Sequence, residues 1–284
     1  MTTLPPLPRL ILEPAVRGAL MEDLGRAGDV TSDAVIPPGT QARAVMRARE
    51  GGIAAGLDAA RLAFELMEPG LAIEQAVAEG ARIAPGETLM TIAGEARGIL
   101  SAERVALNFA CRMSGIATAT RGIADAIAQT RAVVVCTRKT TPGLRVFEKR
   151  AVRAGGGGNH RWGLDDAMLI KDNHVAAAGG IRPALERARA AAGHMMKIEI
   201  EVDTLDQLSE VLATGGADNV LLDNMPLETL REAVSMTQGA VSLEASGRIT
   251  PESAPAIAET GVDYLSAGWL THSARILDLG LDFD

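Results

Sequence analysis

The sequence predicts an α/β fold in two parts: a parallel sheet or barrel from about residue 132 onward, and a smaller α+β domain before it. Three observations support this prediction. In the second part, short apolar runs alternate with amphipathic stretches of helical period, and a charged or glycine-bearing turn follows each run. In the first hundred residues, segments with β-type patterns and a few helices occur without that repeat.

Six short apolar runs occur in the second part. Five of them are four or five residues long, and these are nearly all apolar, either throughout or after one residue. Buried parallel strands have this composition because helices cover both faces of their sheet. The runs span residues 132–136, 167–170, 197–202, 219–222, 240–243 and 262–265. The helical stretches between them span residues 180–192, 205–214, 227–236 and 251–260. The alternation predicts right-handed βαβ units, and therefore a parallel sheet or barrel.

Polar or glycine residues follow each run, at the point where the strand should end. The carboxyl ends of parallel strands meet at one rim, where TIM-type barrels place their active sites. The glycine-bearing turns after the last two strands match the phosphate site of such barrels, because backbone N–H groups can approach an oxyanion there. The rim residues are Arg138 and Lys139, Lys171, Glu201, Asp223, Ser246 with Gly247, and Ala267 with Gly268.

The first part is expected to form two helices, three β-segments and then a long helix. The helices should span residues 10–24 and 57–67, the β-segments 41–49, 72–78 and 87–94, a turn-rich loop 28–39 and a turn 84–86. The long helix should begin at Ser101, whose hydroxyl can cap it, and continue toward Ile127; Gly115 and Gly122 are positions where it could be interrupted. We predict a small domain of residues 1–112, joined by the tail 273–284, and a barrel domain of residues 113–272.

Composition excludes several classes of protein. The chain has 284 residues, 47% of them apolar and only 2% aromatic, which argues against stacking platforms for single-stranded nucleic acid. Cys111 and Cys136 lie in apolar surroundings without metal-ligand spacing, so we expect free thiols in a reducing compartment. No signal-like start and no apolar run of the ~20 residues that span a bilayer are seen, so we expect a cytoplasmic protein.

Positive charge is concentrated in one segment. Residues 137–161 carry a net charge of +6 inside a chain of −8, so the remaining residues sum to −14. An acidic chain with such a segment is expected to hold a small, highly anionic ligand rather than nucleic acid. The alternative, equally weighted for four of the cations, is one solvated helix face; these four are Arg145, Lys149, Arg150 and Arg153.

Specific strings run in order through nearly the whole chain. They are GDVTSDAVIP, SAERVALNF, SGIAT, TRKTTPG, NHRWGLDDAMLIKDNH, EVDTLDQ, LLDNM, EASG and SAGWLTHS. Together they closely resemble the quinolinate phosphoribosyltransferase family. The resemblance implies transfer of phosphoribose from phosphoribosyl pyrophosphate to quinolinate with decarboxylation, giving nicotinate mononucleotide, pyrophosphate and carbon dioxide. It also implies an open-faced α+β sandwich joined to an incomplete TIM-like barrel, and a homodimer.

The resemblance implies a role for each site residue. Arg138, His160 and Arg161 would contact quinolinate, and Arg104 would reach it from the partner subunit. Lys139 and Lys171 would bind the pyrophosphate or a neighbouring carboxylate, and Glu201 and Asp223 would hold Mg²⁺ or ribose hydroxyls. These last four are the expected catalytic residues. The remaining expected substrate contacts are Thr137, Ser246, Gly247, Arg248, Ala267, Gly268 and Trp269, with Arg248 and Trp269 departing from the family's usual small residues.

Structural alternatives stay open for several of these residues. Glu201 and Asp223 could form salt bridges to the lysines that close the rim, and His160 could be a hydrogen-bonded loop residue. His174 is expected to fix a strand-end turn and His272 to cap a last helix. The glycine run at residues 155–158 could give only a flexible loop, but its place directly before residues 159–161 favours a shaped, anion-facing turn.

Three rival functions share parts of this pattern. A same-fold paralogue associated with molybdenum uptake tends to lose the TRKTTPG and LIKDNH strings, and both are complete here. A non-catalytic anion-binding barrel would not need Glu201 and Asp223. A nicotinate phosphoribosyltransferase needs only one ligand carboxylate, so the excess of arginine argues against it. No activated nucleophile is evident, so the expected mechanism is positioning and electrostatic stabilisation, with phosphoribosyl transfer before decarboxylation.

Overall fold

The computed structural model describes residues 4–283, which form two compact units. The first unit contains the chain up to Arg121, Thr141–Gly156 and the residues from Ser273 onward. The second contains Gly122–Thr140 and Gly157–His272. The predicted boundary between residues 112 and 113 falls inside one long helix, α4, which contributes to both units.

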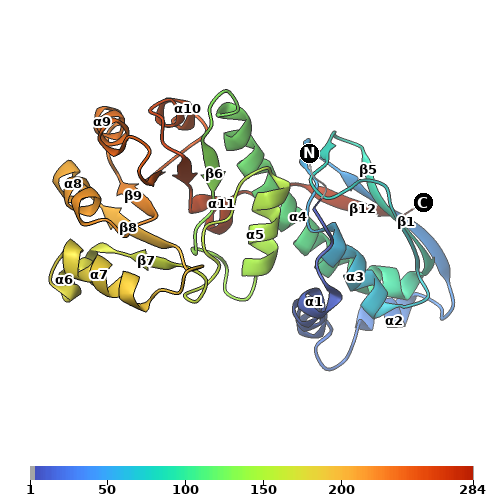
Figure 1. The fold of residues 1–284 in the computed structure, drawn as a ribbon. Coiled ribbons are helices and arrows are strands. Elements are labelled where there is room, and N and C mark those ends of the chain that lie inside the picture. Colours follow the sequence, from blue (N-terminus) through green and yellow to red (C-terminus); the bar gives the residue numbers. More distant parts are fainter. Residues whose placement is uncertain (1–3, 284) are drawn as a thin grey trace. The chain divides into compact units, whose positions relative to one another are not determined.

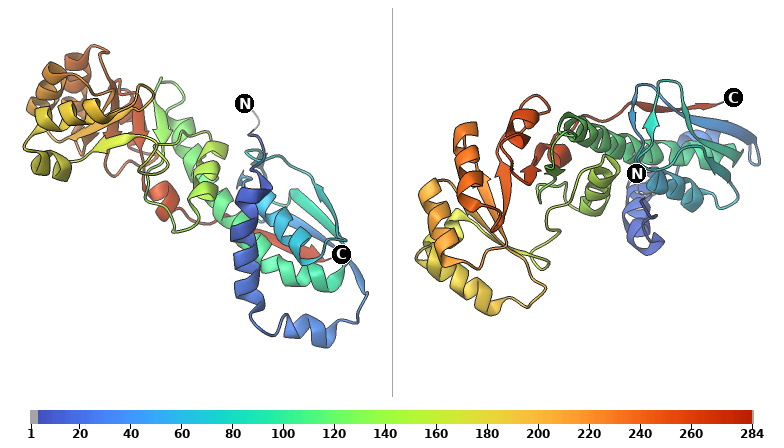
Figure 2. Two further views of the ribbon diagram at one scale, coloured as in Figure 1. Left: turned by 60° about the horizontal axis from the view of Figure 1, so that its bottom comes forward. Right: turned by 45° about the horizontal axis from the view of Figure 1, so that its top comes forward.

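The first unit is built on a four-stranded antiparallel sheet of order β12-β1-β5-β3. Its helices gather on one side of this sheet (Figures 1 and 2), as an open-faced sandwich requires. The strands are β1 (Gln41–Ala48), β3 (Ala72–Gln75), β5 (Thr88–Glu95) and β12 (Leu279–Phe283), with β2 (Gly52–Ile53) and β4 (Arg82–Ile83) forming a separate pair. The helices are α1 (Arg9–Leu24), α2 (Val30–Val35), α3 (Leu57–Met67), α4 (Ala96–Ala126) and α5 (Arg145–Ala154).

The helices of this unit follow apolar spacing in the sequence. On α1, Leu12, Val16 and Leu20 are buried at intervals of four residues, which places them on one face. Pro14 lies in the second turn of α1, so its missing N–H leaves the Leu10 carbonyl without the usual helical donor. Helix α3 has the predicted bounds, buries six side chains that include Leu57, Leu62 and Phe64, and packs against α1.

Helix α4 begins five residues earlier than predicted and is not interrupted. It starts at Ala96, so Ser101 lies inside it and does not cap it; the Ser101 hydroxyl instead donates to Asp29 Oδ2 at 2.9 Å. Gly115 is needed for close packing: a Cβ there would lie 2.1 Å from the carbonyl oxygen of Arg275. The glycine therefore permits the approach of the C-terminal segment without breaking the helix.

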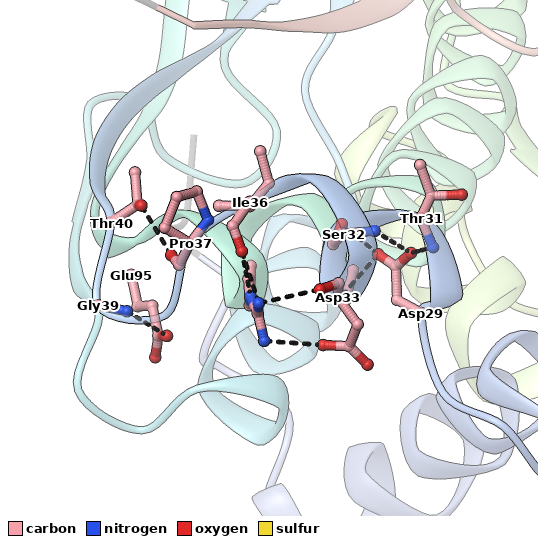
Figure 3. A network of polar contacts seen from close by, with 11 residues as sticks. Asp29, Thr31, Ser32, Asp33, Ile36, Pro37, Gly39, Thr40 and Glu95 are labelled. Carbon is pink, nitrogen blue, oxygen red and sulfur yellow. Dashed lines mark hydrogen bonds and ion pairs between the residues drawn. The ribbon is translucent and has the colours of Figure 1, made fainter.

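The predicted turn-rich loop at residues 28–39 contains a short helix, α2, so that prediction was wrong for Val30–Val35. Asp29 caps it by accepting the N–H groups of Thr31 and Ser32 and the Ser32 hydroxyl (Figure 3). Arg97 of α4 donates to the Ile36 carbonyl and to Asp33. This segment, part of the GDVTSDAVIP string, is therefore tied to α4 by polar contacts within the first unit.

The second unit contains a six-stranded parallel sheet of order β6-β11-β10-β9-β8-β7. The predicted strands are confirmed, with bounds shifted by up to three residues: β6 (Val133–Val135), β7 (Met168–Ile170), β8 (Ile198–Val202), β9 (Asn219–Asp223), β10 (Ser242–Ser246) and β11 (Tyr264–Ser266). Within the described residues β6 and β7 end this order without pairing to each other, so the barrel is incomplete. This confirms the predicted fold class.

Helices cover the outside of the curved sheet in Figures 1 and 2. They are α6 (Asp172–Ala178), α7 (Ile181–Ala191), α8 (Leu205–Thr214), α9 (Leu227–Thr237), α10 (Ala254–Ala258) and α11 (Trp269–His272). The predicted helix at 251–260 is shorter, because Thr250 and Ser253 bond to each other in a turn before it. Thr204 and Gln207 form a capping box that starts α8 at the predicted residue.

None of the helices in residues 4–283 combines the length and the apolar character needed to cross a membrane.

Candidate active site

A cavity of about 410 Å³ opens at the carboxyl ends of the strands of the second unit. Its lining combines cations, carboxylates and hydroxyls from almost every strand. The lining residues are Thr137, Arg138, Lys139, His160, Arg161, Leu169, Lys171, Glu201, Leu221, Asp223, Glu244, Ser246 and Ser266. The strand registers explain the convergence: Asp223, Ser246 and Ser266 pair side by side at the ends of β9, β10 and β11.

Two arginines in the cavity have unused hydrogen-bonding capacity. The Nε atoms of Arg138 and Arg161 are buried and have no hydrogen-bond partner among the described residues. Arg161 donates through Nη1 to the carbonyl oxygen of Ala167 at 3.2 Å, which directs its guanidinium. Burial lowers the pKa of Arg161, and the charge of Arg138 lowers it further. Two neighbouring guanidinium groups with spare donors suit an anion that carries planar carboxylates.

The backbone of Lys139 is held by Thr137 and by Thr271 of α11. Its N–H donates to Thr137 Oγ1 at 3.0 Å, and its carbonyl accepts the Thr271 hydroxyl at 2.8 Å. A Cβ at Gly268 would lie 3.0 Å from Lys139 Cδ, so glycine gives the lysine room. The side chain of Lys139 therefore enters the cavity from a rigid base.

Glu201 and Asp223 are the two carboxylates at the rim. Burial raises the pKa of Glu201, while the charge of Lys171 lowers it and that of Asp223 raises it. Within residues 4–283, no salt bridge joins either carboxylate to Lys139 or Lys171, so the rim-closing alternative is not observed. Asp223 accepts the Asn224 amide at 2.6 Å. Two rim carboxylates facing cations fit a divalent cation of the hard, oxygen-preferring kind.

A buried group beside the cavity joins His160 to two glutamates that we did not predict. His160 Nε2 lies 2.7 Å from Glu199 Oε2 and 3.8 Å from Glu244 Oε1. Both glutamates are nearly inaccessible, with 6% and 4% of their surface exposed. Burial raises the pKa of Glu244 to about 7, and the charge of Glu199 adds to this effect while His160 opposes it. Among the described residues, these side chains are also the one group of three or more potential metal ligands whose ligand atoms lie close together.

Comparisons with known proteins agree with this geometry. A sequence model described as "Quinolinate phosphoribosyl transferase, C-terminal domain" matches residues 116–282, and one described as "Quinolinate phosphoribosyl transferase, N-terminal domain" matches residues 29–114. The chain belongs to the quinolinate phosphoribosyltransferase family.

Relatives within the family are similar over nearly their whole length. The chain is 47% identical over 272 residues to a "Nicotinate-nucleotide pyrophosphorylase (carboxylating)" of Mycobacterium leprae, covering 94% of this chain and 95% of that one. It is 45% identical over 263 residues to a "Probable nicotinate-nucleotide pyrophosphorylase (carboxylating)" of Bacillus subtilis, with coverage of 92% and 90%. A solved nicotinate-nucleotide pyrophosphorylase from Francisella tularensis superposes with a TM-score of 0.94 at 37% identity, over all of both chains.

The residues implied by the family resemblance divide into three groups: those that line the cavity, those next to it, and Arg104. Nine of them line the cavity, and Gly268 lies next to one of these, Lys139; the nine are Thr137, Arg138, Lys139, His160, Arg161, Lys171, Glu201, Asp223 and Ser246. Gly247, Arg248, Ala267 and Trp269 lie in the adjoining loops but do not line it. Arg104 belongs to the first unit, where it is exposed on α4.

The two departures from the family pattern have different surroundings. Arg248 is exposed and has a φ of 48°, a left-handed conformation that few side chains adopt. Trp269 donates through Nε1 to the Ile249 carbonyl at 2.7 Å, which joins the loop after β11 to the one after β10. Trp269 therefore supports both of the loops that the family resemblance links to the 5′-phosphate.

The basic helix α5 does not line this cavity, and of its four cations Arg153 alone is exposed. Lys149 is fully buried, and Arg150 pairs with Asp58 at 3.1 Å within the first unit, so the solvated-face alternative is wrong for both. Buried Glu148 accepts an Arg112 Nη at 2.9 Å and the Thr141 hydroxyl at 2.8 Å. Part of the TRKTTPG string therefore serves the packing of the first unit.

The glycine run packs against backbone rather than facing an anion. A Cβ at Gly155 would lie 2.4 Å from the Ala117 carbonyl, and Gly158 forms a β-bridge with Val135. The prediction of an anion-facing turn was wrong at these two positions, because close backbone packing explains the glycines.

Two histidine predictions have opposite outcomes. His174 Nδ1 accepts the Lys171 N–H at 2.9 Å and so fixes the turn after β7, as predicted. His272 is the last residue of α11, so its predicted position at or before the start of a helix was wrong.

Proposed function

We propose that this chain transfers phosphoribose from phosphoribosyl pyrophosphate to quinolinate and decarboxylates the product, giving nicotinate mononucleotide, pyrophosphate and carbon dioxide in NAD biosynthesis. The observation that carries the proposal is one cavity that combines Arg138, Arg161, Lys139 and Lys171 with the carboxylates Glu201 and Asp223, in a member of this family. Substrates with several negative charges require such a surplus of cations.

Quinolinate is assigned to the arginine side of the cavity. The free Nε donors of Arg138 and Arg161 suit its two adjacent carboxylates, because a guanidinium can bind two oxygens at once. Arg104 is proposed to reach the same ligand from the partner subunit of a homodimer. Exposure of Arg104 on α4 supports this role, since the side chain is available to another chain.

The phosphoribosyl donor is assigned to the remaining groups. Lys139 and Lys171 would bind its pyrophosphate, and the Ser246 hydroxyl with the backbone of Gly247, Ala267 and Gly268 would bind the 5′-phosphate. Glu201 and Asp223 would hold Mg²⁺, a fit supported by their oxygen donors and their lack of salt bridges to the lysines. Bound there, Mg²⁺ would neutralise charge on the leaving pyrophosphate.

The mechanism that follows is positioning and electrostatic stabilisation. The pyridine nitrogen forms a bond to the anomeric carbon of the ribose while the bond from that carbon to pyrophosphate breaks. Lys139 and Lys171 stabilise the charge that develops on the departing oxygens. The ring nitrogen is then cationic, so it can accept the electron pair left on the ring when the adjacent carboxylate departs as carbon dioxide. A proton from water replaces the lost carboxylate.

A single reaction tests the proposal. Purified protein is incubated with quinolinate, phosphoribosyl pyrophosphate and Mg²⁺, and the products are identified by mass spectrometry, with each component omitted in turn. Nicotinate mononucleotide should form only when all three are present. A folded protein that binds quinolinate but forms no product would refute the proposal and favour an anion-binding barrel. Carbon dioxide released without the donor would refute the order of steps.

We also place the protein in the cytoplasm. Cys111 and Cys136 form no disulfide within the described chain, which agrees with a reducing compartment.

A further inference from the structure

His160 has both ring nitrogens engaged within the protein. The main-chain N–H of Arg161 donates to His160 Nδ1 at 2.7 Å, so Nδ1 carries a lone pair. Nε2 therefore bears the proton in the neutral ring and donates it to Glu199 Oε2, also at 2.7 Å. A substrate carboxylate could bond to this ring only if one of the two bonds were broken.

The carboxylate of Glu199 is placed by the alternation of strand β8. Glu199 and Glu201 are two residues apart, so they project to the same face of the sheet. Glu201 lies at the carboxyl end and lines the cavity, while Glu199 is one side-chain repeat deeper and only 6% exposed. A carboxylate at that depth is costly unless it is hydrogen-bonded. His160 supplies the bond to Oε2, whereas Oε1 is buried without a partner among residues 4–283.

The other end of this chain of contacts is an arginine in the cavity. Arg161 follows His160 directly, and its main chain is held by the imidazole. Its guanidinium lies near that of Arg138, whose charge lowers the pKa of Arg161, while the charge of Glu199 raises it. Glu199 therefore acts on Arg161 in two ways: through the hydrogen bonds of His160 and by opposing the repulsion from Arg138.

The geometry points to Glu199 as a positioning residue for the dicarboxylate-binding side of the cavity, acting through His160 on Arg161. Glu199 fixes the tautomer of His160, which makes Nδ1 a hydrogen-bond acceptor. Nδ1 then holds the main chain of Arg161, so that the Arg161 guanidinium faces the ligand. This inference rests on the proposed function, because it assigns the ligand of Arg161 to quinolinate. In this arrangement His160 is part of the support for the subsite rather than a direct ligand contact.

The test compares Glu199→Leu, Glu199→Gln and an exposed strand control, Glu74→Leu. Leucine removes the acceptor, and glutamine keeps one at the same position. For each variant we would measure the KM for quinolinate, the KM for phosphoribosyl pyrophosphate, kcat, the Kd for quinolinate alone by calorimetry, and the Tm. Loss of a hydrogen bond from this support should weaken quinolinate binding about 10- to 100-fold.

Glu199→Leu should raise the KM and Kd for quinolinate by that factor and leave the KM for the donor within about threefold. Glu199→Gln should retain quinolinate binding to within about threefold, because its amide oxygen can accept the Nε2 proton. Glu74→Leu should match the wild type. Equal losses for both substrates together with a lower Tm, or equal quinolinate losses for Leu and Gln, would overturn the inference.

A spectroscopic readout is independent of turnover. The chain has four histidines, and ¹⁵N labelling resolves their tautomers, with His160→Gln identifying the signal of interest. His160 should be a single Nε2–H tautomer in the wild type and a mixture in Glu199→Leu. A mixture in the wild type would overturn the inference. If the wild-type protein formed no nicotinate mononucleotide from its substrates, the proposed function would be refuted. The tautomer of His160 could still be measured, because that measurement does not depend on turnover.

Discussion

Replacing Glu244 with glutamine should change the pH dependence of stability. Glu244 is 4% exposed, and burial with the nearby charge of Glu199 raises its pKa to about 7 from an ordinary value of 4.5. The folded state therefore binds this proton more tightly than the unfolded state does. The resulting stabilisation is fully present below pH 4.5 and is lost as the pH rises through 7.

The magnitude follows from the difference between the pKa of Glu244 in the folded state and its ordinary value. A difference of one in pKa corresponds to about 1.4 kcal/mol, so raising the pH from 5 to 8 should cost the wild type about 2 kcal/mol of unfolding free energy through Glu244. Glutamine cannot ionise, so Glu244→Gln escapes this loss. For a domain of this size the difference is about 6 °C in Tm. The variant should therefore gain about 6 °C on the wild type between pH 5 and pH 8.

Tryptophan fluorescence is the appropriate assay, because both tryptophans of the chain, Trp162 and Trp269, belong to the second unit together with Glu244. Thermal scans at one rate for both proteins would give the difference in Tm at each pH. The exposed substitution Glu74→Gln serves as a control and should follow the wild type. A difference between Glu244→Gln and wild type that stays constant from pH 5 to pH 8 would refute the reasoning, because Glu244 would then not titrate in that interval.

Three further predictions concern the cavity and its ligands. Arg161→Ala should lower kcat/KM for quinolinate about 30-fold or more, since a buried charge partner is lost; steady-state kinetics would measure this, with the exposed Arg231→Ala as control. Mixing Arg104→Ala and Arg138→Ala proteins should restore part of the activity in heterodimers. Gly247→Ala should raise the KM for the donor, because φ is 109° and the new Cβ would lie 2.2 Å from Asn224 Oδ1.

The outcomes that would contradict these predictions differ. An unchanged kcat/KM would remove Arg161 from the quinolinate site. No recovery of activity, despite proven subunit exchange, would place Arg104 and Arg138 in one subunit's site. For Gly247→Ala, the matched control is Gly239→Ala, which shares a positive φ of 77° but has open space around the new Cβ. Equal effects of the two on the donor KM would assign the loss to strain alone.

Local pattern was sufficient for most elements of the second unit. The bounds of the predicted strands fall within three residues of those of β6–β11, and α8 has the predicted bounds. Each of these signals is short in range: an apolar run, a capping box, a glycine after the last turn. The rim residues followed as a consequence, because parallel strands must end at the same edge.

Several predictions from the sequence were wrong because the residue concerned contacts a partner that is far away in the chain. Ser101 satisfied a capping pattern, but its partner is Asp29, 72 residues away. The glycines at 155 and 158 resembled an anion-binding loop, yet one packs on α4 and the other bridges to β6. Lys149 and Arg150 fitted a solvated helix face and are buried or paired within the first unit. None of these partners could be chosen from local spacing.

The alternating pattern of strand β8 could have predicted one more buried residue, Glu199. The run KIEIEV alternates strictly, so the inference that Glu201 faces the rim already required Glu199 to face the barrel interior. A buried carboxylate needs a donor, and every residue of the NHR string that precedes the second strand carries one. The sequence could not show that His160 is the partner of Glu199. These residues are 39 positions apart, and they meet only in the folded, curved sheet. The sequence therefore indicated an interior glutamate. The identity of its partner, and hence the support of Arg161, could be found only from the tertiary structure.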